Sequence, residues 1–454
     1  MPYIPNSPSQ IKEMLRACGV KSPADFYSDL PEEIRIKDDL DIPAGISEQQ
    51  LKRKLLALSD KNRPLDKFNS FLGAGCYDHY IPAALSFIIS QPEFSTAYTP
   101  YQAECSQGAL QAIYEYQSYI CRLTGMDVSN ASLLDGGSAL AEAVLMSARL
   151  NRRNTVIISE ALNPEYKEVL KTYLKGHDLK TYEVQVSGEG KTDLSMFLNA
   201  CDKDTSCLVF QSPNFFGVVE NLIEIKKLFK DESVLKIMVT NPLSLAVFKE
   251  PSSFGFDIVC GDGQPLGGGL RLGGACFGFL AAKKEYLRQV PGRIVGKTLD
   301  SHGNVAYCLT LQAREQHIRR EKARSNICSN QSLNALASAV YLSLLGRKGL
   351  REVALTSMSN AHYLRQGLSR IRGIKLTFSP LIFNEFVWFT DNAPQVLNEL
   401  YKKGIIAGYY IGKHFNKYNG GVLSCCTEKK TKEEINDFIN SLAEVLHGEK
   451  AYIR

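Results

Sequence analysis

The 454-residue sequence lacks several features that mark particular classes of protein. No window approaches the roughly 20 consecutive apolar residues that a membrane-spanning helix requires. The first six residues have neither the positive region nor the apolar region of a secretory signal. The net charge of +5 is spread along the chain, without the basic stripe of a nucleic-acid binder. We therefore expect a cytoplasmic protein that binds neither nucleic acid nor membrane.

The sequence contains cysteines, but their spacing does not indicate a disulfide framework. The 12 cysteines have no regular spacing, and a long chain without a signal peptide favours free thiols in a reducing compartment. Two pairs could hold a metal, namely Cys76 with His79 and Cys425 with Cys426. Each pair offers two ligands where a structural zinc site needs four, so we expect buried side chains and no metal.

Residues 1–65 are predicted to form a helical arm. Ser7 and Gln10 have the spacing of a capping box and predict a first helix to about Ala17. Two further short helices are predicted after the capping residues Ser22 and Ser47. Helices this short cannot bury their own apolar faces, so we expect the arm to wrap around the rest of the chain or a neighbouring subunit.

Strand-like and helix-like segments alternate over residues 66–345, which are predicted to form one large domain. Short β-rich runs occur at residues 155–159, 207–211, 235–240 and 256–260, with helices expected at 164–174 and 222–229. Near-continuous apolar strands separated by helices indicate an α/β domain whose mostly parallel sheet is covered on both faces.

The pattern changes after Gly346, and residues 346–454 are predicted to form a small C-terminal α+β domain. The expected helices cover residues 350–371, 394–402 and 432–446. The expected strands cover residues 374–378, 385–389 and 422–425.

A loop before the helix expected at residues 106–125 is the first candidate site. Polar and aromatic side chains gather on this loop, which Pro100 bends: Tyr98, Tyr101, Gln102 and Glu104. Such groups on a loop held by a rigid helix are typical of a functional site. A hydrogen-bonded turn that only positions the helix is the alternative.

A turn before another helix is the second candidate site. It consists of Asp135, Gly136, Gly137 and Ser138. Glycines and a serine there expose backbone N–H groups at the positive end of the helix, which suits a phosphate. The same residues also serve as helix caps, so this motif alone is weak.

Six segments together carry a resemblance to a known family. They are TAYTPYQ (96–102), DG (135–136), QSPNF (211–215), GDGQPLG (261–267), LTLQAREQHIR (309–319) and KARSNI (322–327). The segments resemble the P-protein of the glycine cleavage system, and in particular the α subunit (subunit 1) of its two-chain form. The resemblance runs over nearly the whole chain.

The resemblance implies a fold-type-I pyridoxal-phosphate-dependent transferase-like large domain that pairs with a homologous β subunit in an α2β2 assembly. It also implies glycine dehydrogenase (aminomethyl-transferring, decarboxylating) activity. In that reaction the complex decarboxylates glycine through pyridoxal phosphate and transfers the aminomethyl group to lipoylated H-protein. In this family the β chain carries the cofactor lysine in a His-Lys-Thr motif. Counted from Asp257, the histidine and lysine positions are Gln264 and Pro265 here.

Two elements of cofactor chemistry are therefore missing from this chain. The glycine-rich residues 261–269 contain no lysine, and an amine is required to hold pyridoxal phosphate as an imine. Asn241 stands where such enzymes place an aspartate, and an amide cannot supply the charge that keeps the pyridine nitrogen protonated. We expect the β subunit to bind the cofactor and this chain to be inactive alone.

The resemblance also gives expected roles to the candidate residues. Tyr98, Tyr101, Gln102 and Glu104 would form a wall of the β-chain site and of the channel for the lipoyl arm. Residues 135–138 would be a vestigial phosphate turn. Arg314, Arg319 and Arg324, expected on a helix over residues 309–326, are candidates for contacting H-protein or the partner subunit. Solvation and local ion pairs are an equally strong explanation for these arginines.

Two other interpretations stay open. The chain could be a free-standing pyridoxal-phosphate-dependent aminotransferase or lyase that uses another lysine, such as Lys297. It could also be a purely scaffolding subunit that holds the β chain in shape.

Overall fold

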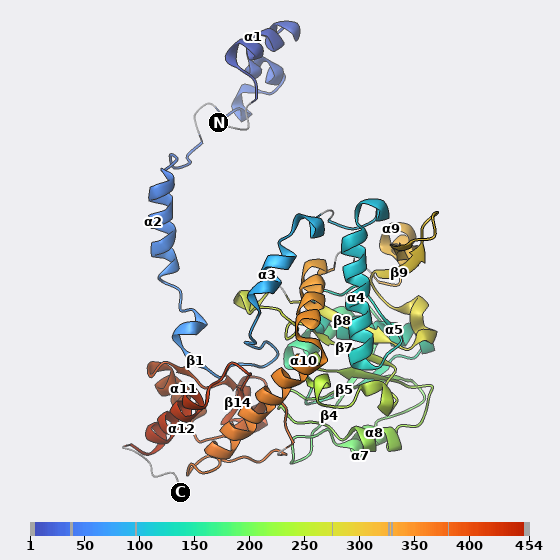
Figure 1. The fold of residues 1–454 in the computed structure, drawn as a ribbon, viewed down its shortest axis with the longest axis vertical. Coiled ribbons are helices and arrows are strands. Elements are labelled where there is room, and N and C mark those ends of the chain that lie inside the picture. Colours follow the sequence, from blue (N-terminus) through green and yellow to red (C-terminus); the bar gives the residue numbers. More distant parts are fainter. Residues whose placement is uncertain are drawn as a thin grey trace. The chain divides into compact units, whose positions relative to one another are not determined.

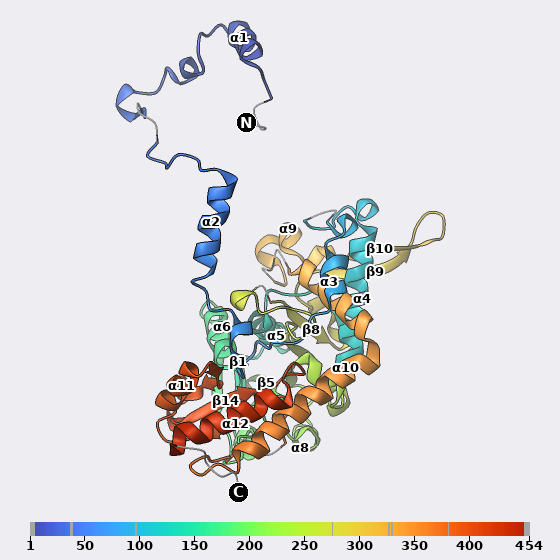
Figure 2. The same ribbon diagram turned by 60° about the vertical axis from the view of Figure 1, so that its left-hand side comes forward.

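A computed structural model describes residues 5–36, 40–95, 98–274, 276–325, 327, 330–379 and 381–448. The chain divides into two compact units, Met1–Arg63 and Pro64–Arg454 (Figures 1 and 2). Among the described residues, no helix is long and apolar enough to cross a membrane.

The described residues of the first unit form two α-helices. Helix α1 (Pro8–Ala17) begins with the predicted capping box, in which Ser7 and Gln10 each accept a hydrogen bond from the other's backbone N–H. Helix α2 (Glu48–Ser59) begins with a second capping box. Between them, the second predicted helix is a 3-10 turn at Pro23–Tyr27. No described residue of this unit is buried, and many of its apolar side chains are exposed, among them Ile34 and Ile36.

The second unit is built on a seven-stranded sheet with the order β2-β8-β7-β6-β5-β3-β4. Its strands are β2 (Val128–Ser129), β3 (Thr155–Ser159), β4 (Lys180–Val184), β5 (Thr205–Gln211), β6 (Leu235–Val239), β7 (Ile258–Asp262) and β8 (Gly278–Ala282). Neighbouring strands from β7 to β4 are parallel, whereas β8 and β2 are antiparallel to their neighbours. The predicted mostly parallel α/β sheet is confirmed.

The helices of this unit flank the sheet and continue into its C-terminal part. They are α3 (Ala83–Ile89), α4 (Gln107–Thr124), α5 (Gly136–Asn151), α6 (Pro164–Leu174), α7 (Leu194–Asn199), α8 (Leu222–Leu228), α9 (Gln316–Arg319), α10 (Ser332–Leu368), α11 (Ala393–Lys402) and α12 (Lys432–His447). Helices α4 and α10 lie side by side (Figure 1).

Alternate residues of the central strand β5 enter two separate hydrophobic cores. Leu208 and Phe210 pack with residues of α4 and α10. Cys207 and Val209 pack with residues of α5 and α6. Because successive side chains of a strand point to opposite faces, helices cover both faces of the sheet, as its apolar strands predicted.

The C-terminal part packs a small antiparallel sheet against helices. Its strands are β11 (Glu385–Phe389), β14 (Gly421–Cys425) and β13 (Tyr409–Tyr410), in that order. Helix α12 lies along one half of α10 (Figure 2). Gly346, with φ 58° and ψ −171°, interrupts α10 where the sequence predicted a domain boundary, which stays a prediction.

The strand predicted at residues 374–378 is wrong. Only Lys375 forms an isolated bridge, to Phe389. Farther along, Phe378 is buried in an aromatic cluster, where its ring centroid lies 5.1 Å from that of Phe216. The apolar character of this segment therefore reflects burial rather than strand pairing.

The helix predicted at residues 309–326 is also wrong. Strand β10 (Val305–Thr310) pairs with β9 (Ile294–Leu299), and Leu311 then adopts φ 55°, which ends the strand. Short turns and the four-residue helix α9 follow. The guanidinium of Arg314 donates hydrogen bonds to the carbonyls of Val290 and Gly292, so distant contacts shape this segment.

Candidate functional site

The turn at the start of α5 is closed by groups of this chain. Asp135 Oδ1 accepts a hydrogen bond of 2.7 Å from the N–H of Ser138, whose Oγ accepts one of 3.1 Å from the N–H of Asp135. The N–H of Gly136 donates to Asp262 Oδ2 at 3.1 Å. Two backbone donors of this turn, the N–H groups of Gly136 and Ser138, therefore already bind carboxyl groups of the chain.

Tyr166 of α6 covers the same turn. A Cβ atom on Gly136 would lie 2.2 Å from Tyr166 Oη, so only glycine allows this close approach. Burial raises the pKa of Tyr166 well above its ordinary value, which keeps the phenol neutral. The first turn of α5 thus packs against a neutral hydroxyl and a carboxyl group.

A small polar cavity lies beside these groups. Its volume is about 30 Å³, which is room for one or two water molecules. Its lining includes Tyr77, Asn163, Tyr166, Gln211, Asn214, Asn241, Asp262, Pro265, Asn384 and Glu385. No lysine is among the described residues that line it, and Lys297 lies exposed on β9. We call this cavity and its lining the cleft.

Two carboxyl groups face the cleft, the partly buried Asp262 and the buried Glu385. Burial raises the pKa of Asp262 to about 7, although hydrogen bonds from backbone N–H groups oppose the shift. Burial also raises the pKa of Glu385 to about 7. Glu385 accepts hydrogen bonds from the N–H of Ala74 at 2.6 Å and from Tyr77 Oη at 2.7 Å. Asp262 lies in the GDGQPLG segment, but no sequence pattern indicated a role for its carboxyl group or for that of Glu385, because their partners are distant in the chain.

The cleft does not fit pyridoxal phosphate. A cavity of about 30 Å³ is far smaller than the roughly 300–1,000 Å³ of ordinary ligand pockets. Asn241 Oδ1 accepts from the N–H of Leu243 at 3.0 Å, and its buried Nδ2 has no hydrogen-bond partner in the described part of the chain. The neutral amide of Asn241, the absence of a lysine and the hydrogen-bonded turn at residues 135–138 all argue against a bound pyridoxal phosphate.

Gln264, which the resemblance places where the β chain is expected to carry a histidine, has a structural role here. Gln264 Oε1 accepts a hydrogen bond from the N–H of Tyr77 at 2.9 Å. Its Nε2 donates to the carbonyls of Tyr77 at 2.8 Å and Gly268 at 2.7 Å. Gln264 therefore ties the glycine-rich segment to the chain before α3.

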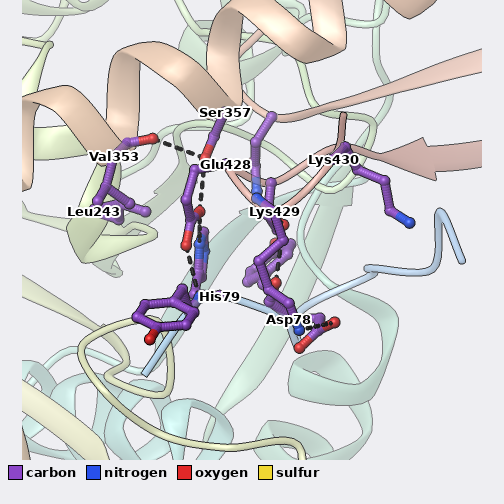
Figure 3. A network of polar contacts seen from close by, with 12 residues as sticks. Asp78, His79, Leu243, Val353, Ser357, Glu428, Lys429 and Lys430 are labelled. Carbon is purple, nitrogen blue, oxygen red and sulfur yellow. Dashed lines mark hydrogen bonds and ion pairs between the residues drawn. The ribbon is translucent and has the colours of Figure 1, made fainter. Parts of the chain in front are cut away.

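A second polar network joins the same segment to the C-terminal part (Figure 3). His79 Nδ1 lies 2.6 Å from Glu428 Oε2, and the N–H of Tyr80 donates to Glu428 Oε1 at 2.7 Å. Ser357 Oγ, on α10, also lies within hydrogen-bond distance of Glu428, at 3.2 Å. Burial would raise the pKa of Glu428, but the hydrogen bond and charge of His79 lower it below its ordinary value.

The two pairs considered as metal ligands, Cys76 with His79 and Cys425 with Cys426, contain side chains that have other surroundings. His79 is engaged by Glu428, while Cys425 and Cys426 are buried. Within the described ranges, no group of three or more His, Cys, Asp or Glu side chains could hold a metal ion.

The aromatic loop lies apart from the cleft. Tyr98 is 87% exposed and Tyr101 is 47% exposed, and Gln102 and Glu104 are exposed as well. Thr96 and Ala97 lie outside the described residues. Tyr98 lines a separate cavity of about 320 Å³ that shares no lining residue with the cleft. Helix α4 begins at Gln107 as predicted, but the Ser106 side chain makes no capping hydrogen bond.

Arg293 supports this loop through a hydrogen bond to Tyr101. The residue is 7% exposed, and its Nη2 donates to Tyr101 Oη at 3.3 Å. Its Nη1 donates to Asn330 Oδ1 at 3.3 Å, and its Nε lies 3.7 Å from Glu315 Oε2. The Tyr101 ring also lies 5.3 Å from that of His317, between centroids. The sequence offered no pattern that singles out Arg293.

The three arginines predicted as contact residues have different surroundings. Arg314 is held by backbone carbonyls, and burial lowers its pKa. Arg319 and Arg324 are exposed, although Arg319 Nε donates to the carbonyl of Ala313 at 3.0 Å. Only the latter two present side chains that another molecule could reach.

Comparisons with known proteins agree with the sequence resemblance. The sequence profile of the glycine cleavage system P-protein matches residues 1–442. A probable glycine dehydrogenase (decarboxylating) subunit 1 of Carboxydothermus hydrogenoformans is 46% identical over 99% of this chain and 100% of the relative. Its counterpart from Geobacillus kaustophilus is 47% identical over 97% of this chain and 98% of the relative.

Solved structures extend the comparison. An inhibitor-bound glycine decarboxylase (P-protein) of the glycine cleavage system superposes with a TM-score of 0.88 at 39% identity, over 98% of this chain and 100% of that one. A Lactobacillus brevis glutamate decarboxylase gives a TM-score of 0.67 at 13% identity, over 95% and 98% of the two chains, and shares the fold. The chain therefore belongs to the glycine cleavage system P-protein family.

Proposed function

We propose that this chain is the α subunit of a two-chain glycine decarboxylase and works only in a cytoplasmic α2β2 complex. The relatives named subunit 1 support this assignment, since they match over nearly their whole length. With its β subunit, the complex decarboxylates glycine by pyridoxal-phosphate chemistry and passes the aminomethyl group to lipoylated H-protein.

The filled cleft is the observation that carries this proposal. Asp262 and Tyr166 occupy the first turn of α5, and a cavity of about 30 Å³ remains. A chain of this family that leaves no room for the cofactor must obtain the chemistry from a partner. We therefore assign pyridoxal phosphate to the β subunit.

The aromatic loop is the part of this chain that we assign to the partner's site. Its tyrosines are exposed and lie outside the chain's own cleft, yet buried Arg293 holds Tyr101. A rigidly supported exposed loop suits a wall of a neighbouring active site, because its geometry is set before binding. Tyr98 and Tyr101 supply aromatic surface that excludes water, while Gln102 and Glu104 orient polar groups.

Arg319 and Arg324 are the exposed cations that we assign to H-protein or partner contact. Charges at the rim of an interface mainly raise the association rate and make it depend on salt. Their effect is therefore expected in the concentration of H-protein needed for half-maximal rate rather than in the maximal rate.

Substitution of the loop tyrosines tests the proposal. Tyr98→Ala and Tyr101→Ala complexes should lose at least tenfold in glycine-dependent carbon dioxide exchange with lipoylated H-protein, with unchanged assembly and cofactor content. Tyr182→Ala is the matched control, because Tyr182 is 54% exposed on strand β4. Unchanged rates in fully assembled Tyr98 and Tyr101 variants would leave this chain with a scaffolding role only.

A further inference from the structure

Strands β9 and β10 form a hairpin that projects from the body of the second unit (Figure 2). The two strands pair along their whole length, and no third strand among the described residues joins them. A two-stranded hairpin is at best marginally stable in water unless another surface packs against it. The hairpin therefore needs packing partners along its length.

One face of the hairpin is buried at the base and exposed at the tip. Its cross-strand pairs, from base to tip, are Val295 with Leu309, Lys297 with Tyr307, and Leu299 with Val305. The base pair is buried against Leu110 and Ile113 of α4. The tip pair is 64% exposed at Leu299 and 52% exposed at Val305. The apolar face that α4 covers at the base thus continues, uncovered, to the tip.

The turn at the tip is held by its own hydrogen bonds. Asp300 Oδ1 accepts from the N–H groups of His302 and Asn304, each at 2.8 Å. The N–H of Asp300 donates to the carbonyl of Asn304, also at 2.8 Å. Leu299 and Val305 are therefore held side by side before any partner arrives, which lowers the entropy that docking costs.

The hairpin is joined directly to the aromatic loop. Gln107 Nε2 donates to the carbonyls of Ala103 and Tyr307, each at 2.8 Å, and its Oε1 accepts from the N–H of Tyr307 at 2.9 Å. Ala103 packs against the buried base of the hairpin. Arg293, directly before β9, donates to Tyr101. A molecule that covers the aromatic loop therefore also reaches the hairpin.

We propose that the β9–β10 hairpin docks into the β subunit, which buries Leu299 and Val305 in an apolar pocket beside the site that the aromatic loop completes. This inference rests on the α–β assembly proposed above. Ala103 of the aromatic loop packs on the face of the hairpin that carries the tip pair, so the partner that covers the loop also covers the tip. Removing these two side chains from water favours association.

Binding of the purified β subunit to this chain tests the proposal. Leu299→Glu should raise the dissociation constant about tenfold or more in biolayer interferometry on immobilised β subunit, because it places a carboxylate in an apolar pocket. Ile223→Glu is the matched control and should leave the constant unchanged. Ile223 is 61% exposed on α8, which lies away from the hairpin in both views (Figures 1 and 2).

Hydrogen–deuterium exchange of the wild-type chain gives a second measurement that needs no substitution. Amide exchange over residues 297–305 should slow by about threefold or more when the β subunit binds. Equal affinity of wild type and Leu299→Glu for the β subunit, or unchanged exchange at the tip in the formed complex, would overturn the proposal and leave the α–β assembly in place.

Other occupants of the tip would give different results. Unchanged affinity for the β subunit together with lost self-association of Leu299→Glu would assign the tip to a second copy of this chain. Unchanged affinity together with lost H-protein binding would assign it to H-protein. Either result overturns the proposal. No binding of the wild-type chain to the β subunit would overturn the assembly itself, and the docking of the hairpin with it.

Discussion

Asp262 Oδ2 lies 3.1 Å from the backbone nitrogen of Gly136 and accepts its hydrogen bond. The end of β7 thereby occupies the first turn of α5, where the backbone donors of the turn converge. A carboxylate of the chain itself takes the place that the sequence suggested for a phosphate. The α/β fold is retained, while polar groups beside its cleft form hydrogen bonds with one another.

Restoring the missing lysine should not restore a cofactor site. In Pro265→Lys the new amine would still face a cleft of about 30 Å³ with Asp262 and Tyr166 in place. We expect no pyridoxyl group on the isolated variant after borohydride reduction, measured by mass spectrometry. Circular dichroism checks that the variant is folded. A stoichiometric pyridoxyl adduct on Lys at this position would show that the cleft is open.

Glu385 should make folding stability depend on pH. Its pKa is about 7 in the folded chain against an ordinary value of 4.5, so the folded state binds more protons between these values. Its contribution to stability is greatest below pH 4.5 and is lost as the pH rises through 7. Between pH 5 and 8, wild type should lose about 2 kcal/mol more unfolding free energy than Glu385→Gln.

Urea denaturation at several pH values measures this difference. Trp388, the single tryptophan, is buried and donates from Nε1 to Ser424 Oγ at 2.8 Å, so its fluorescence reports unfolding of the C-terminal part. Parallel pH profiles for wild type and Glu385→Gln would mean that Glu385 is already ionised in the folded chain.

His79→Ala should destabilise the C-terminal part strongly. The substitution leaves Glu428, whose side chain is 13% exposed, without its partner at 2.6 Å, which costs about 3 kcal/mol. Lys429→Ala is the matched control (Figure 3). Lys429 pairs with Asp78 at 2.7 Å, but the two side chains are 40% and 39% exposed, so its loss should cost below about 1 kcal/mol. Equal losses of stability in the two variants, measured by Trp388 fluorescence, would show that His79 and Glu428 contribute no more than an exposed ion pair.

Arg293→Met should impair activity without preventing assembly. It removes the hydrogen bond to Tyr101 and the contacts to Asn330 and Glu315, so the aromatic loop loses its support. We expect kcat of the α–β complex to fall about tenfold at unchanged cofactor content. Arg293→Lys should recover part of the rate, because it keeps the charge. A rate equal to wild type in Arg293→Met would separate Arg293 from the function of the loop.

Local patterns in the sequence predicted the elements that local contacts determine. The capping box of Ser7 and Gln10 involves residues three apart, and α1 begins there. The apolar run that became β5 contains alternate residues for two cores, which explains why it was recognisable as a strand. The parallel sheet followed from such runs.

Contacts between distant residues explain what the sequence did not predict. Glu385 and Tyr77 are 308 positions apart in the sequence, and Arg293 and Tyr101 are 192 positions apart, yet each pair forms a hydrogen bond. The segment after β10 has an apolar and basic pattern suited to a helix, but Arg314 bonds to carbonyls near residue 290 and Leu311 turns the chain. Composition and periodicity do not indicate which distant residues will contact each other.

Purifying this chain alone and together with its β subunit provides the most direct measurement. Each preparation is assayed for bound pyridoxal phosphate and for glycine decarboxylation with lipoylated H-protein. We predict no cofactor and no decarboxylation for the chain alone, and one cofactor per α–β pair, bound to the β subunit, in the active complex. A chain that forms a borohydride-reducible imine or decarboxylates glycine by itself would contradict the assignment.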